Sequence, residues 1–380
     1  MYTIFLARYV GAGSEFKGFS ANFSTSKKVS AFQSCLRKIG IRPILLVTHD
    51  GDLAPRQTVV KKVGDCICII PASSKHLKSR MMKYLSGLFF SSVMVYKLRK
   101  RLSVSLFFSW DYLPDTLFPL LLQGRKTISR SIVDIEESIG ADPRAGRLFK
   151  AFEYLVVRYL PLRAIGNNAS TAESLGVELE GIFPGFFASS LAEEEHLLNR
   201  VEWKNFHEKT VVLFSGRIDT VRGASQFVEL ARSFEFQTGI HFVMTGYGNS
   251  DEVEEILRMK TKNLIFRPGL PRSDYIDFLF GSDIAFNFIS DEQFMNNSFP
   301  SKVVEYLLGT VVIISNHPVD IGSKRVVVRD NLVDMKAFIT EYHNDRQRWR
   351  ASYVPEIIKR ELSPFSISRC ATDLSRLFNA

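Results

Sequence analysis

Short apolar runs alternate along the whole chain with longer stretches in which apolar residues recur at helical spacing. Val211–Ser215 is such an apolar run, and the segment Gly223–Phe236 after it carries Phe227, Leu230 and Phe234 on one stripe. Continuous apolar runs are typical of strands buried on both faces, and a helix after each strand is typical of parallel sheets. We therefore expect an α/β fold in which parallel sheets are covered by helices on both faces.

The first half of the chain carries this alternation up to a short polar segment. Strands are expected at Tyr2–Ala7, Pro43–Thr48, Cys66–Ile70, Ser103–Ser109, Thr127–Asp134 and Arg163–Gly166, with a last short one at Gly181–Gly185. Helices are expected at Lys27–Lys38, Lys75–Lys100, Pro114–Leu122, Pro143–Leu160 and Ala169–Leu175.

The second half restarts the same pattern. Its strands are expected at Val211–Ser215, His241–Thr245, Asn263–Phe266, Asp283–Phe288 and Val311–Ser315. Its helices are expected at Gly223–Phe236, Asp251–Lys260, Ser273–Phe280 with Ser273 as the cap, and Pro300–Leu308.

The length of 380 residues suits two domains better than one core. We predict a Rossmann-like domain over residues 1–190 and a second over residues 205–360, with a C-terminal helix at about 363–380 that packs back on the first. The polar segment Ala192–His196 and the weakly patterned Val201–Lys209 are the predicted linker. Two such halves predict facing doubly wound domains with an interdomain cleft, in which ligands bind beyond the carboxyl ends of the strands.

The composition is that of a folded protein, with 46% hydrophobic and 23% charged residues. The four cysteines show no metal-ligand or disulfide-framework spacing, which favours a reducing cytoplasm. The N-terminus starts with a strand-like run and shows no signal peptide. The longest apolar stretch, Tyr84–Leu98, is too short and too polar to span a bilayer.

The net charge of +9 comes largely from the segment Lys75–Arg101, whose cations bracket that apolar stretch. A basic, partly amphipathic helix of this kind can lie on an anionic membrane surface, which would make the protein peripheral on the inner face of the membrane. The alternative is a solvated helix face over the core. Nucleic acid is not expected as a partner, because the chain has no zinc-finger spacing and no RNA-recognition signature.

Three segments that follow strands of the second half carry candidate chemistry. The first contains Gly216, Arg217 and Arg222, where two cations meet the start of a helix and suit a diphosphate. The second, Gly246-Tyr-Gly-Asn249, lacks the full dinucleotide-binding pattern and is also compatible with a plain strand-to-helix turn.

The third segment, Asn296–Glu305, is a polar loop that runs into a helix N-terminus. Ser301 and Lys302 at this N-terminus suit a phosphate, and Glu305 further along the helix could accept both hydroxyls of a ribose. The alternative for Glu305 is an exposed helix glutamate paired with Lys302 or Lys324.

The order and spacing of these segments resemble a known family. Phe214-Ser-Gly-Arg217, Arg222-Gly223, Thr245-Gly-Tyr-Gly248, Leu264–Gly269, Ser282–Ala285 and Phe299–Leu307 together resemble the C-terminal domain of GT-B glycosyltransferases. The match is to the large retaining family 4 type, which includes bacterial polysaccharide and lipopolysaccharide sugar transferases. The resemblance covers roughly a hundred residues and is specific only as an ensemble.

The resemblance implies a transferase that uses a UDP- or GDP-linked sugar as donor substrate, with no cofactor and no metal. Arg217 and Arg222, with Gly216, Ser301 and Lys302, would bind the donor diphosphate. Glu305 would hold the ribose, and Gly246, Phe266 and Arg267 would lie beside the ribose and nucleobase.

The sequence departs from the family where the first glutamate of the Glu-x7-Glu motif would fall, because that position is Asn297. We expect Asn297 and Ser298 to act there in its place. In the first half, the resemblance places Gly11 and Gly13 in the acceptor loop. Asp134 and Glu136 could orient an acceptor hydroxyl where relatives carry a histidine, and Trp110 could line the acceptor cleft. The alternative for both carboxylates is a surface or helix-capping role.

The function expected is therefore transfer of a sugar to a glycan or lipid-linked acceptor, in bacterial surface polysaccharide or lipopolysaccharide synthesis. The alternatives are a non-catalytic GT-B scaffold or binding subunit, prompted by Asn297, and a GT-B nucleotide-sugar epimerase. The sequence does not give the sugar, the nucleotide, the acceptor or the oligomeric state.

Overall fold

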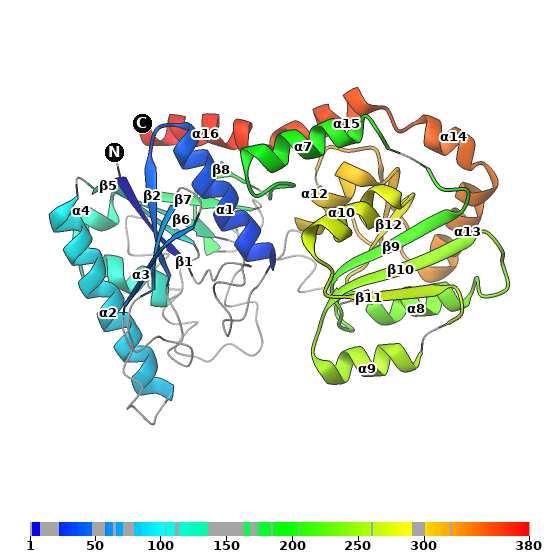
Figure 1. The fold of residues 1–380 in the computed structure, drawn as a ribbon, viewed down its shortest axis with the longest axis horizontal. Helices are drawn as coiled ribbons and strands as arrows, with labels where there is room; N and C mark the ends of the chain where they lie inside the picture. The colour runs from blue at the N-terminus through cyan, green and yellow to red at the C-terminus, as the bar shows by residue number, and fades with distance from the viewer. Residues whose placement is uncertain are drawn as a thin grey trace. The chain divides into compact units, whose positions relative to one another are not determined.

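The computed structural model divides the chain into two compact units, each with its own sheet (Figure 1). The first unit comprises the described residues of Met1–Leu191 and Phe365–Ala380, and the second comprises those of Ala192–Asn296 and Pro300–Pro364. The structure describes residues 2–7, 23–47, 58–63, 66–70, 80–102, 104–110, 114–135, 163–167, 173, 175–183, 185–204, 206–259, 261–290, 301–319 and 321–379.

The sheet of the first unit has the strand order β3-β4-β2-β1-β5-β6-β7-β8. These strands are β1 (Tyr2–Ala7), β2 (Arg42–Val47), β3 (Val59–Val63), β4 (Cys66–Ile70), β5 (Val104–Trp110), β6 (Ser131–Ile135), β7 (Arg163–Gly166) and β8 (Leu179–Ile182). All neighbouring pairs are parallel except β3 with β4, which are antiparallel. Strand β3 is absent from the predicted elements because its sequence, Val-Val-Lys-Lys-Val, lacks a continuous apolar run.

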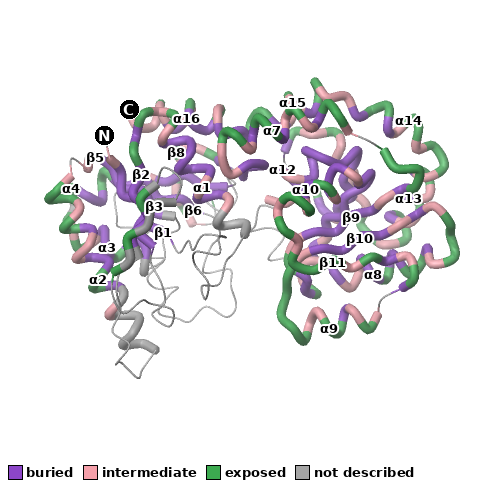
Figure 2. The backbone as a smooth tube through the Cα atoms, in the orientation of Figure 1, coloured by how far each residue is buried: buried purple, intermediate pink, exposed green. Residues whose placement is uncertain are grey.

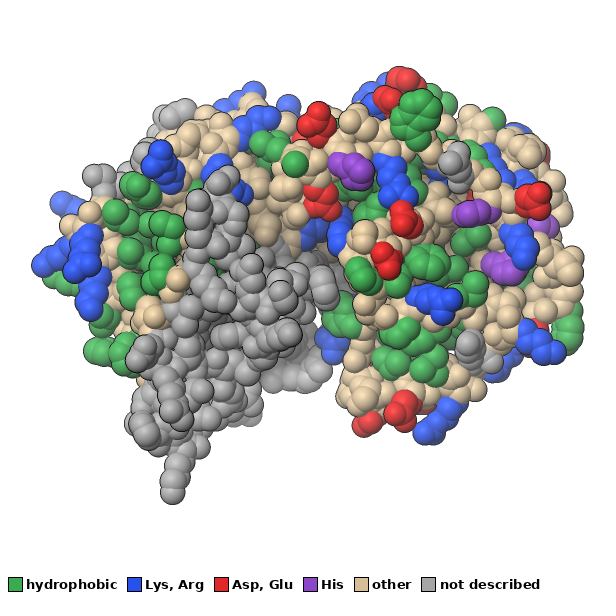
Figure 3. All heavy atoms as spheres, viewed as in Figure 1, with side chains coloured by type: hydrophobic (Ala, Val, Ile, Leu, Met, Phe, Trp, Pro, Cys, Tyr) green, Lys and Arg blue, Asp and Glu red, His purple; other side chains and the backbone are tan. Residues whose placement is uncertain are grey.

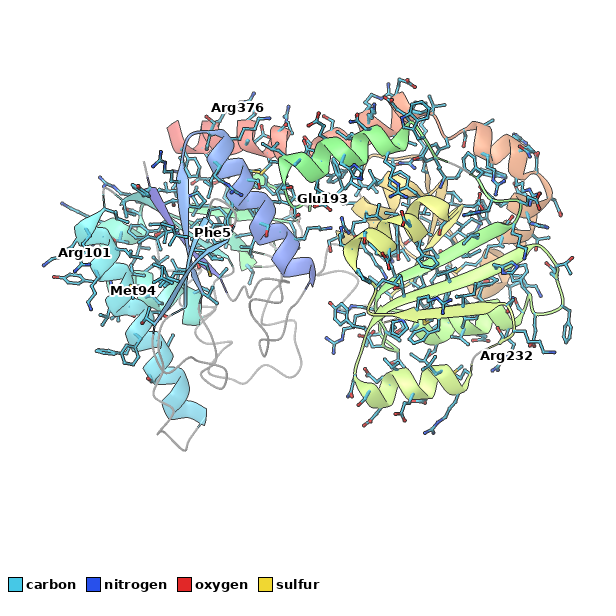
Figure 4. The ribbon with its side chains drawn as sticks, in the orientation of Figure 1. Phe5, Met94, Arg101, Glu193, Arg232 and Arg376 are labelled. Carbon is cyan, nitrogen blue, oxygen red and sulfur yellow. The ribbon has the colours of Figure 1, made fainter. Side chains whose placement is uncertain are left out.

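The helices of the first unit are α1 (Phe23–Lys38), α2 (Arg80–Arg101), α3 (Pro114–Leu121), α4 (Arg125–Ile128) and α16 (Ile367–Asn379). The core contains Phe5, labelled in Figure 4, whose ring stacks on Phe108 at a centroid distance of 4.6 Å. Helix α16 packs on α1, where the Lys38 ammonium donates to Ser368 Oγ at 2.6 Å. The C-terminal segment of the chain therefore belongs to the first unit.

The second unit contains a wholly parallel sheet with the order β11-β10-β9-β12-β13-β14. Its strands are β9 (Thr210–Arg217), β10 (Ile240–Tyr247), β11 (Leu264–Pro268), β12 (Ile284–Asn287), β13 (Val312–Ser315) and β14 (Val326–Val328). The chain runs outward from β9 through β10 and β11, and then crosses back to β12 on the other side of β9. The strand order therefore reverses between β9 and β12, which is where open α/β sheets bind ligands.

Helices cover both faces of this sheet, with α8 and α9 on one side and α10 and α12 on the other (Figure 1). The helices of the unit are α7 (Leu191–Val201), α8 (Ala224–Arg232), α9 (Ser250–Arg258), α10 (Arg272–Gly281), α12 (Ser301–Gly309), α13 (Leu332–Asn344), α14 (Arg346–Ala351) and α15 (Pro355–Leu362). The inner strands β9, β10, β12 and β13 are buried along most of their length, whereas the edge strands β11 and β14 and the outer sides of the helices are not (Figure 2). This matches the expected difference between continuous apolar strands and amphipathic helices.

Three local predictions are wrong. The polar segment Ala192–His196, predicted as part of the linker, lies within helix α7. This helix is stabilised by Glu193 and Glu194, whose charges in the first turn interact favourably with the helix dipole, and by the burial of Leu197. The predicted strand Thr127–Asp134 begins only at Ser131, after helix α4. Ser273 does not cap α10: the helix starts at Arg272 and its N-cap is Pro271.

The predicted helix at Pro143–Leu160 lies outside the described residues. In the part of the chain that the structure describes, none of the helices has the length and apolar character needed to cross a bilayer.

Candidate functional site

The carboxyl ends of β9 and β10 come so close together that only glycine fits there. Gly216 has φ +125° and Gly246 has φ +148°. A Cβ on Gly246 would lie 1.7 Å from the carbonyl oxygen of Gly216. The glycine turn at Gly246 therefore reflects the close approach of two backbones, in the left-handed region that other residues rarely adopt.

In the turn after β9, two arginines pair with one carboxylate. Asp219 is 5% exposed, and its Oδ2 lies 3.2 Å from Arg217 Nε and 2.6 Å from Arg222 Nη1. The backbone N–H of Arg222 also donates to Asp219 Oδ1 at 2.8 Å. Asp219 thus fixes the turn and orients both guanidinium groups at the sheet edge.

The turn ends at Gly223, the residue before helix α8. Gly223 has φ +77°, and a Cβ there would lie 2.6 Å from Cβ of Phe288 after β12. This contact holds the arginine turn against the end of β12. The two predicted diphosphate ligands are therefore anchored at the point where the strand order reverses.

Lys302 in the first turn of α12 brings a third cation to the same edge. Its Cδ lies 3.7 Å from where a Cβ on Gly216 would be, and its ammonium lies 4.9 Å from the centre of the Phe214 ring. The ammonium is buried and has no hydrogen-bond partner among the residues that the structure describes. Burial, with the nearby charge of Arg222, lowers the pKa of Lys302 to about 8.

Glu305, one turn further along α12, is held by two side chains of α10. Its Oε1 lies 2.6 Å from Arg272 Nη1, and its Oε2 accepts from the Tyr275 hydroxyl at 3.0 Å. Arg272 also bonds Glu193 of α7 at 3.0 Å. Burial alone would lower the pKa of Arg272, but the carboxylates of Glu305 and Glu193 raise it above its ordinary value. Neither Lys302 nor Lys324 is the partner of Glu305.

Tyr306 ties this helix to β9. Its hydroxyl accepts from the backbone N–H of Ser215 at 2.9 Å. Ser215 Oγ also lies 3.2 Å from the Tyr275 hydroxyl. Burial raises the pKa of Tyr306 and of Tyr275 above the ordinary tyrosine value, so both phenols stay protonated and keep these bonds. The carboxylate of Glu305 is therefore fixed relative to the end of β9.

The remaining predicted residues of the second half that the structure describes lie around this edge. Ser301 is the first residue of α12. Phe266 and Arg267 lie on the edge strand β11, where Phe266 is half-buried and Arg267 is exposed. Asn297 and Ser298 lie outside the described residues.

In the first half, the structure argues against the predicted role of Asp134. Its side chain is 0% exposed and its carboxylate lies 3.0 Å from Lys28 Nζ, so it is a buried ion-pair partner and not a carboxylate presented to an acceptor. Trp110 ends β5. Its side chain, like Glu136, Gly11 and Gly13, lies outside the described part of the chain.

Three residues of this site are not among those predicted from the sequence: Asp219, Arg272 and Tyr275. The sequence does contain an indication for Asp219, since an aspartate between two arginines in a post-strand turn commonly pairs with them. It contains no indication for Arg272 and Tyr275, because only the packing of α10 beside α12 brings them to Glu305.

The arrangement suits a polyanion joined to a polyol. Arg217, Arg222 and Lys302 gather positive charge at the switch point, and Glu305 presents a hydrogen-bond acceptor from the next turn of α12. Among the described residues, no cluster of His, Cys, Asp and Glu could hold a metal ion. A separate hollow of about 550 Å³, lined by His207 and His241, lies at the opposite, amino ends of β9 and β10.

Comparison with solved structures shows that the fold is that of GT-B glycosyltransferases. Sucrose-phosphate synthase from Thermosynechococcus elongatus is 10% identical, with a TM-score of 0.70 over 100% of this chain and 98% of that one. An α,α-trehalose-phosphate synthase (UDP-forming) from Burkholderia xenovorans, in complex with glucose-6-phosphate, is 11% identical, with a TM-score of 0.68 over 99% of each chain.

An E. coli trehalose-6-phosphate protein bound with UDP-2-fluoro glucose is 10% identical, with a TM-score of 0.63 over 100% of this chain and 99% of that one. Comparison with protein-family models and with curated proteins finds no match. The similarity to family 4 suggested by the sequence motifs is therefore supported at the level of the GT-B fold.

Proposed function

We propose that this chain is a glycosyltransferase that moves a sugar from a nucleotide-diphosphate sugar to a glycan or lipid-linked acceptor. The observation that carries the proposal is the placement of Arg217, Arg222 and Lys302 together at the switch point of the second sheet, one turn of α12 from Glu305. Cations at that place suit a diphosphate, and a fixed carboxylate beside them suits a ribose.

The reaction builds negative charge on the diphosphate as the glycosidic bond breaks. Guanidinium groups that are already oriented by Asp219 stabilise this charge without reorganising, which lowers the barrier to departure. The protein supplies the opposing charge itself, so the proposal involves no metal and no cofactor. We further propose that the configuration at the anomeric carbon is retained, because the sequence motifs resemble those of retaining enzymes.

The donor is proposed to be UDP-linked, with a GDP-linked sugar as the alternative. Two of the structural neighbours are described as UDP-forming and as bound with UDP-2-fluoro glucose, which supports the UDP form. One neighbour holds glucose-6-phosphate, so a small sugar phosphate is the rival to a glycan or lipid-linked acceptor. The motif resemblance favours the larger acceptor and a cytoplasmic enzyme of bacterial surface polysaccharide or lipopolysaccharide synthesis.

A membrane surface is proposed as a partner through helix α2. The chain has no acidic residue between Asp65 and Asp111. On α2, Phe89, Tyr96 and Lys100 share one face, and the Lys100 ammonium lies 4.8 Å from the centre of the Tyr96 ring. Basic side chains gather beside hydrophobic ones over the C-terminal end of α2 and over α4 (Figure 3). Exposed aromatic rings flanked by cations suit an anionic bilayer.

A transfer assay separates the enzyme from a non-catalytic scaffold. Purified protein is incubated with a radiolabelled nucleotide sugar and either a bacterial membrane extract or glucose-6-phosphate, and the labelled product and the released nucleoside diphosphate are measured. The proposal expects product with the wild type and a loss of about 100-fold or more with Glu305→Ala. Absence of product with every donor, or an unchanged Glu305→Ala rate, would favour the scaffold.

A further inference from the structure

Three buried polar atoms that have no hydrogen-bond partner in the described part of the chain lie at the carboxyl ends of three neighbouring strands of the second sheet. They are Nζ of Lys302, which lies against the end of β9, Oδ1 of Asn287 at the end of β12, and Nε2 of His317 just beyond β13. Asn287 is 0% exposed and His317 is 6% exposed. Buried polar groups are normally hydrogen-bonded, so three orphaned atoms at one sheet edge need an explanation.

The tautomer of His317 follows from its neighbours. Asn316 Oδ1 accepts from the backbone N–H of Ile289 at 2.9 Å, and Asn316 Nδ2 donates to the Ile289 carbonyl at 2.8 Å, which fixes the orientation of the amide. His317 Nδ1 lies 3.1 Å from that same Oδ1, so Nδ1 carries the proton. Burial, together with the nearby charge of Lys302, lowers the pKa of His317 to about 4, so the ring is neutral. The orphaned Nε2 is therefore a hydrogen-bond acceptor.

Asn287 supplies a second acceptor. Its Nδ2 donates to Ser315 Oγ at 3.0 Å, while Oδ1 has no partner among the described residues. Asn287 and Ser315 are register partners across β12 and β13, and Ser315 Oγ lies 3.5 Å from His317 Nδ1. The side chains of Asn287 and His317 thus both contact Ser315, and the two residues lie at the same edge of the sheet.

Lys302 contributes the complementary donor. Its side chain lies against Gly216 and Phe214 at the end of β9, and it is near enough to Arg222 and to His317 for their charges to interact. A set of one ammonium donor and two acceptors is matched by a group that offers both hydroxyl protons and oxygen lone pairs. A diphosphate has no hydroxyl protons to offer two acceptors, whereas a hexose has several.

We infer that Lys302, Asn287 and His317 form a buried polar subsite that binds the hydroxyl groups of the donor's sugar, next to the diphosphate subsite at Arg217 and Arg222. This inference rests on the proposed function. It assigns recognition of the donor sugar to residues outside the Glu-x7-Glu motif. In this subsite, Asn287 Oδ1 and His317 Nε2 each accept a hydrogen bond from a sugar hydroxyl. The Lys302 ammonium donates to an oxygen between the sugar and the diphosphate. Selectivity follows because the correct hydroxyls satisfy buried acceptors that otherwise stay unpaired.

The test compares the binding of a nucleoside diphosphate with that of its sugar conjugate by isothermal titration calorimetry. UDP with UDP-glucose and GDP with GDP-mannose are titrated into the wild type, His317→Phe and Asn287→Leu, which keep the volume and remove the acceptor. The sugar conjugate should bind about tenfold more weakly to each variant, while the affinity for the nucleoside diphosphate should change less than twofold. His317→Gln, which offers an amide oxygen, should recover part of the loss.

His241→Phe is the matched control, because His241 lies at the amino end of β10 and should leave both affinities unchanged. A second measurement protects the test against misfolded variants: in wild-type protein with ¹⁵N-labelled histidine, the imidazole ¹⁵N shifts of His317 should move on adding the sugar conjugate and stay in place on adding the nucleoside diphosphate.

Equal losses for conjugate and nucleoside diphosphate, or no loss in either variant, would overturn the subsite while leaving the proposed function in place. If neither UDP nor GDP binds the wild type, the proposed function fails and the subsite fails with it.

Discussion

The carboxylate of Asp219 lies 2.6 Å from Nη1 of Arg222 and also accepts the backbone N–H of the same residue. One buried aspartate thus fixes both the turn and the guanidinium group that follows it, while also pairing with Arg217. The arginines are held in place before any ligand arrives. The negative charge of Asp219 also allows three cations to gather at this edge of the sheet, since Arg222 and Lys302 would otherwise repel each other.

Replacement of this carboxylate should destabilise the protein. We expect Asp219→Asn to lower the free energy of unfolding by about 2 kcal/mol, because it removes charge-assisted bonds and leaves neighbouring cations uncompensated. Urea denaturation measures the loss. The control is Asp345→Asn, since the Asp345–Arg348 pair is exposed and should contribute less than about 0.5 kcal/mol. Equal effects of the two substitutions would contradict the assigned role of Asp219.

Arg272 links two glutamates with different expected roles. Glu305→Gln and Glu193→Gln each remove one carboxylate from Arg272, so both should lower the unfolding free energy by about 1–2 kcal/mol. Only Glu305 is proposed to hold the ribose. UDP affinity measured by calorimetry should therefore fall about tenfold or more in Glu305→Gln and change less than threefold in Glu193→Gln. A fall of similar size in both variants would mean that Glu305 acts only by holding α10 to α12.

Lys302 should give opposite pH dependences to stability and to ligand binding. Its pKa is about 8 in the folded protein and 10.5 in its ordinary state, so between these pH values the unfolded chain binds the extra proton. The contribution of Lys302 to the free energy of unfolding without ligand should therefore rise with pH over that range. UDP affinity should fall over the same range, because the ammonium that binds phosphate loses its proton.

Urea denaturation and UDP titration between pH 7 and pH 10, each compared with Lys302→Met, measure these two slopes. The Lys302→Met variant should lack both. A UDP affinity that falls with pH equally in both proteins would show that another group is responsible.

The membrane proposal predicts flotation with anionic vesicles. Wild-type protein should float with phosphatidylglycerol vesicles at low salt and remain behind at 1 M salt, where the Debye length is about 3 Å. The triple variant Lys97→Glu, Lys100→Glu, Arg101→Glu should lose flotation, since each cation near the surface contributes about 1 kcal/mol. Arg101 projects from the end of α2 (Figure 4). As a control, Arg258→Glu with Arg348→Glu should float normally, and loss of flotation there would indicate non-specific charge attraction.

The sequence predicted strands β9 to β13 of the second sheet closely because they are short apolar runs separated by amphipathic helices, but it did not predict the three-residue strand β14. The predicted strand Val211–Ser215 became β9 at Thr210–Arg217, with ends that differ by one or two residues. Strand β3 was missed because it lies at the edge of its sheet, where no continuous apolar run is needed. Helix α7 was missed because most of its residues are polar or charged, and only a narrow stripe of the helix is buried.

The site was predictable only where its residues follow strands in sequence. Arg217 and Arg222 could be placed at the sheet edge because the carboxyl ends of parallel strands meet there. The pairing of Glu305 with Arg272 and Tyr275 could not be predicted, because it depends on how α10 packs beside α12. The burial of Asp134 against Lys28 could not be predicted for the same reason, since the sequence of a strand does not show which helix packs over its polar residue.

The central claim is that the carboxyl edge of the second sheet binds a nucleoside diphosphate through its arginines. Calorimetric titration of UDP and GDP into the wild type and Arg222→Met tests it most directly, with Arg232→Met as the matched control, because Arg232 ends helix α8 and bonds only a backbone carbonyl among the contacts described. The account predicts saturable one-to-one binding to the wild type and to Arg232→Met, and an affinity at least about tenfold weaker for Arg222→Met. No binding of either nucleotide to the wild type, or equal binding to all three proteins, would contradict it.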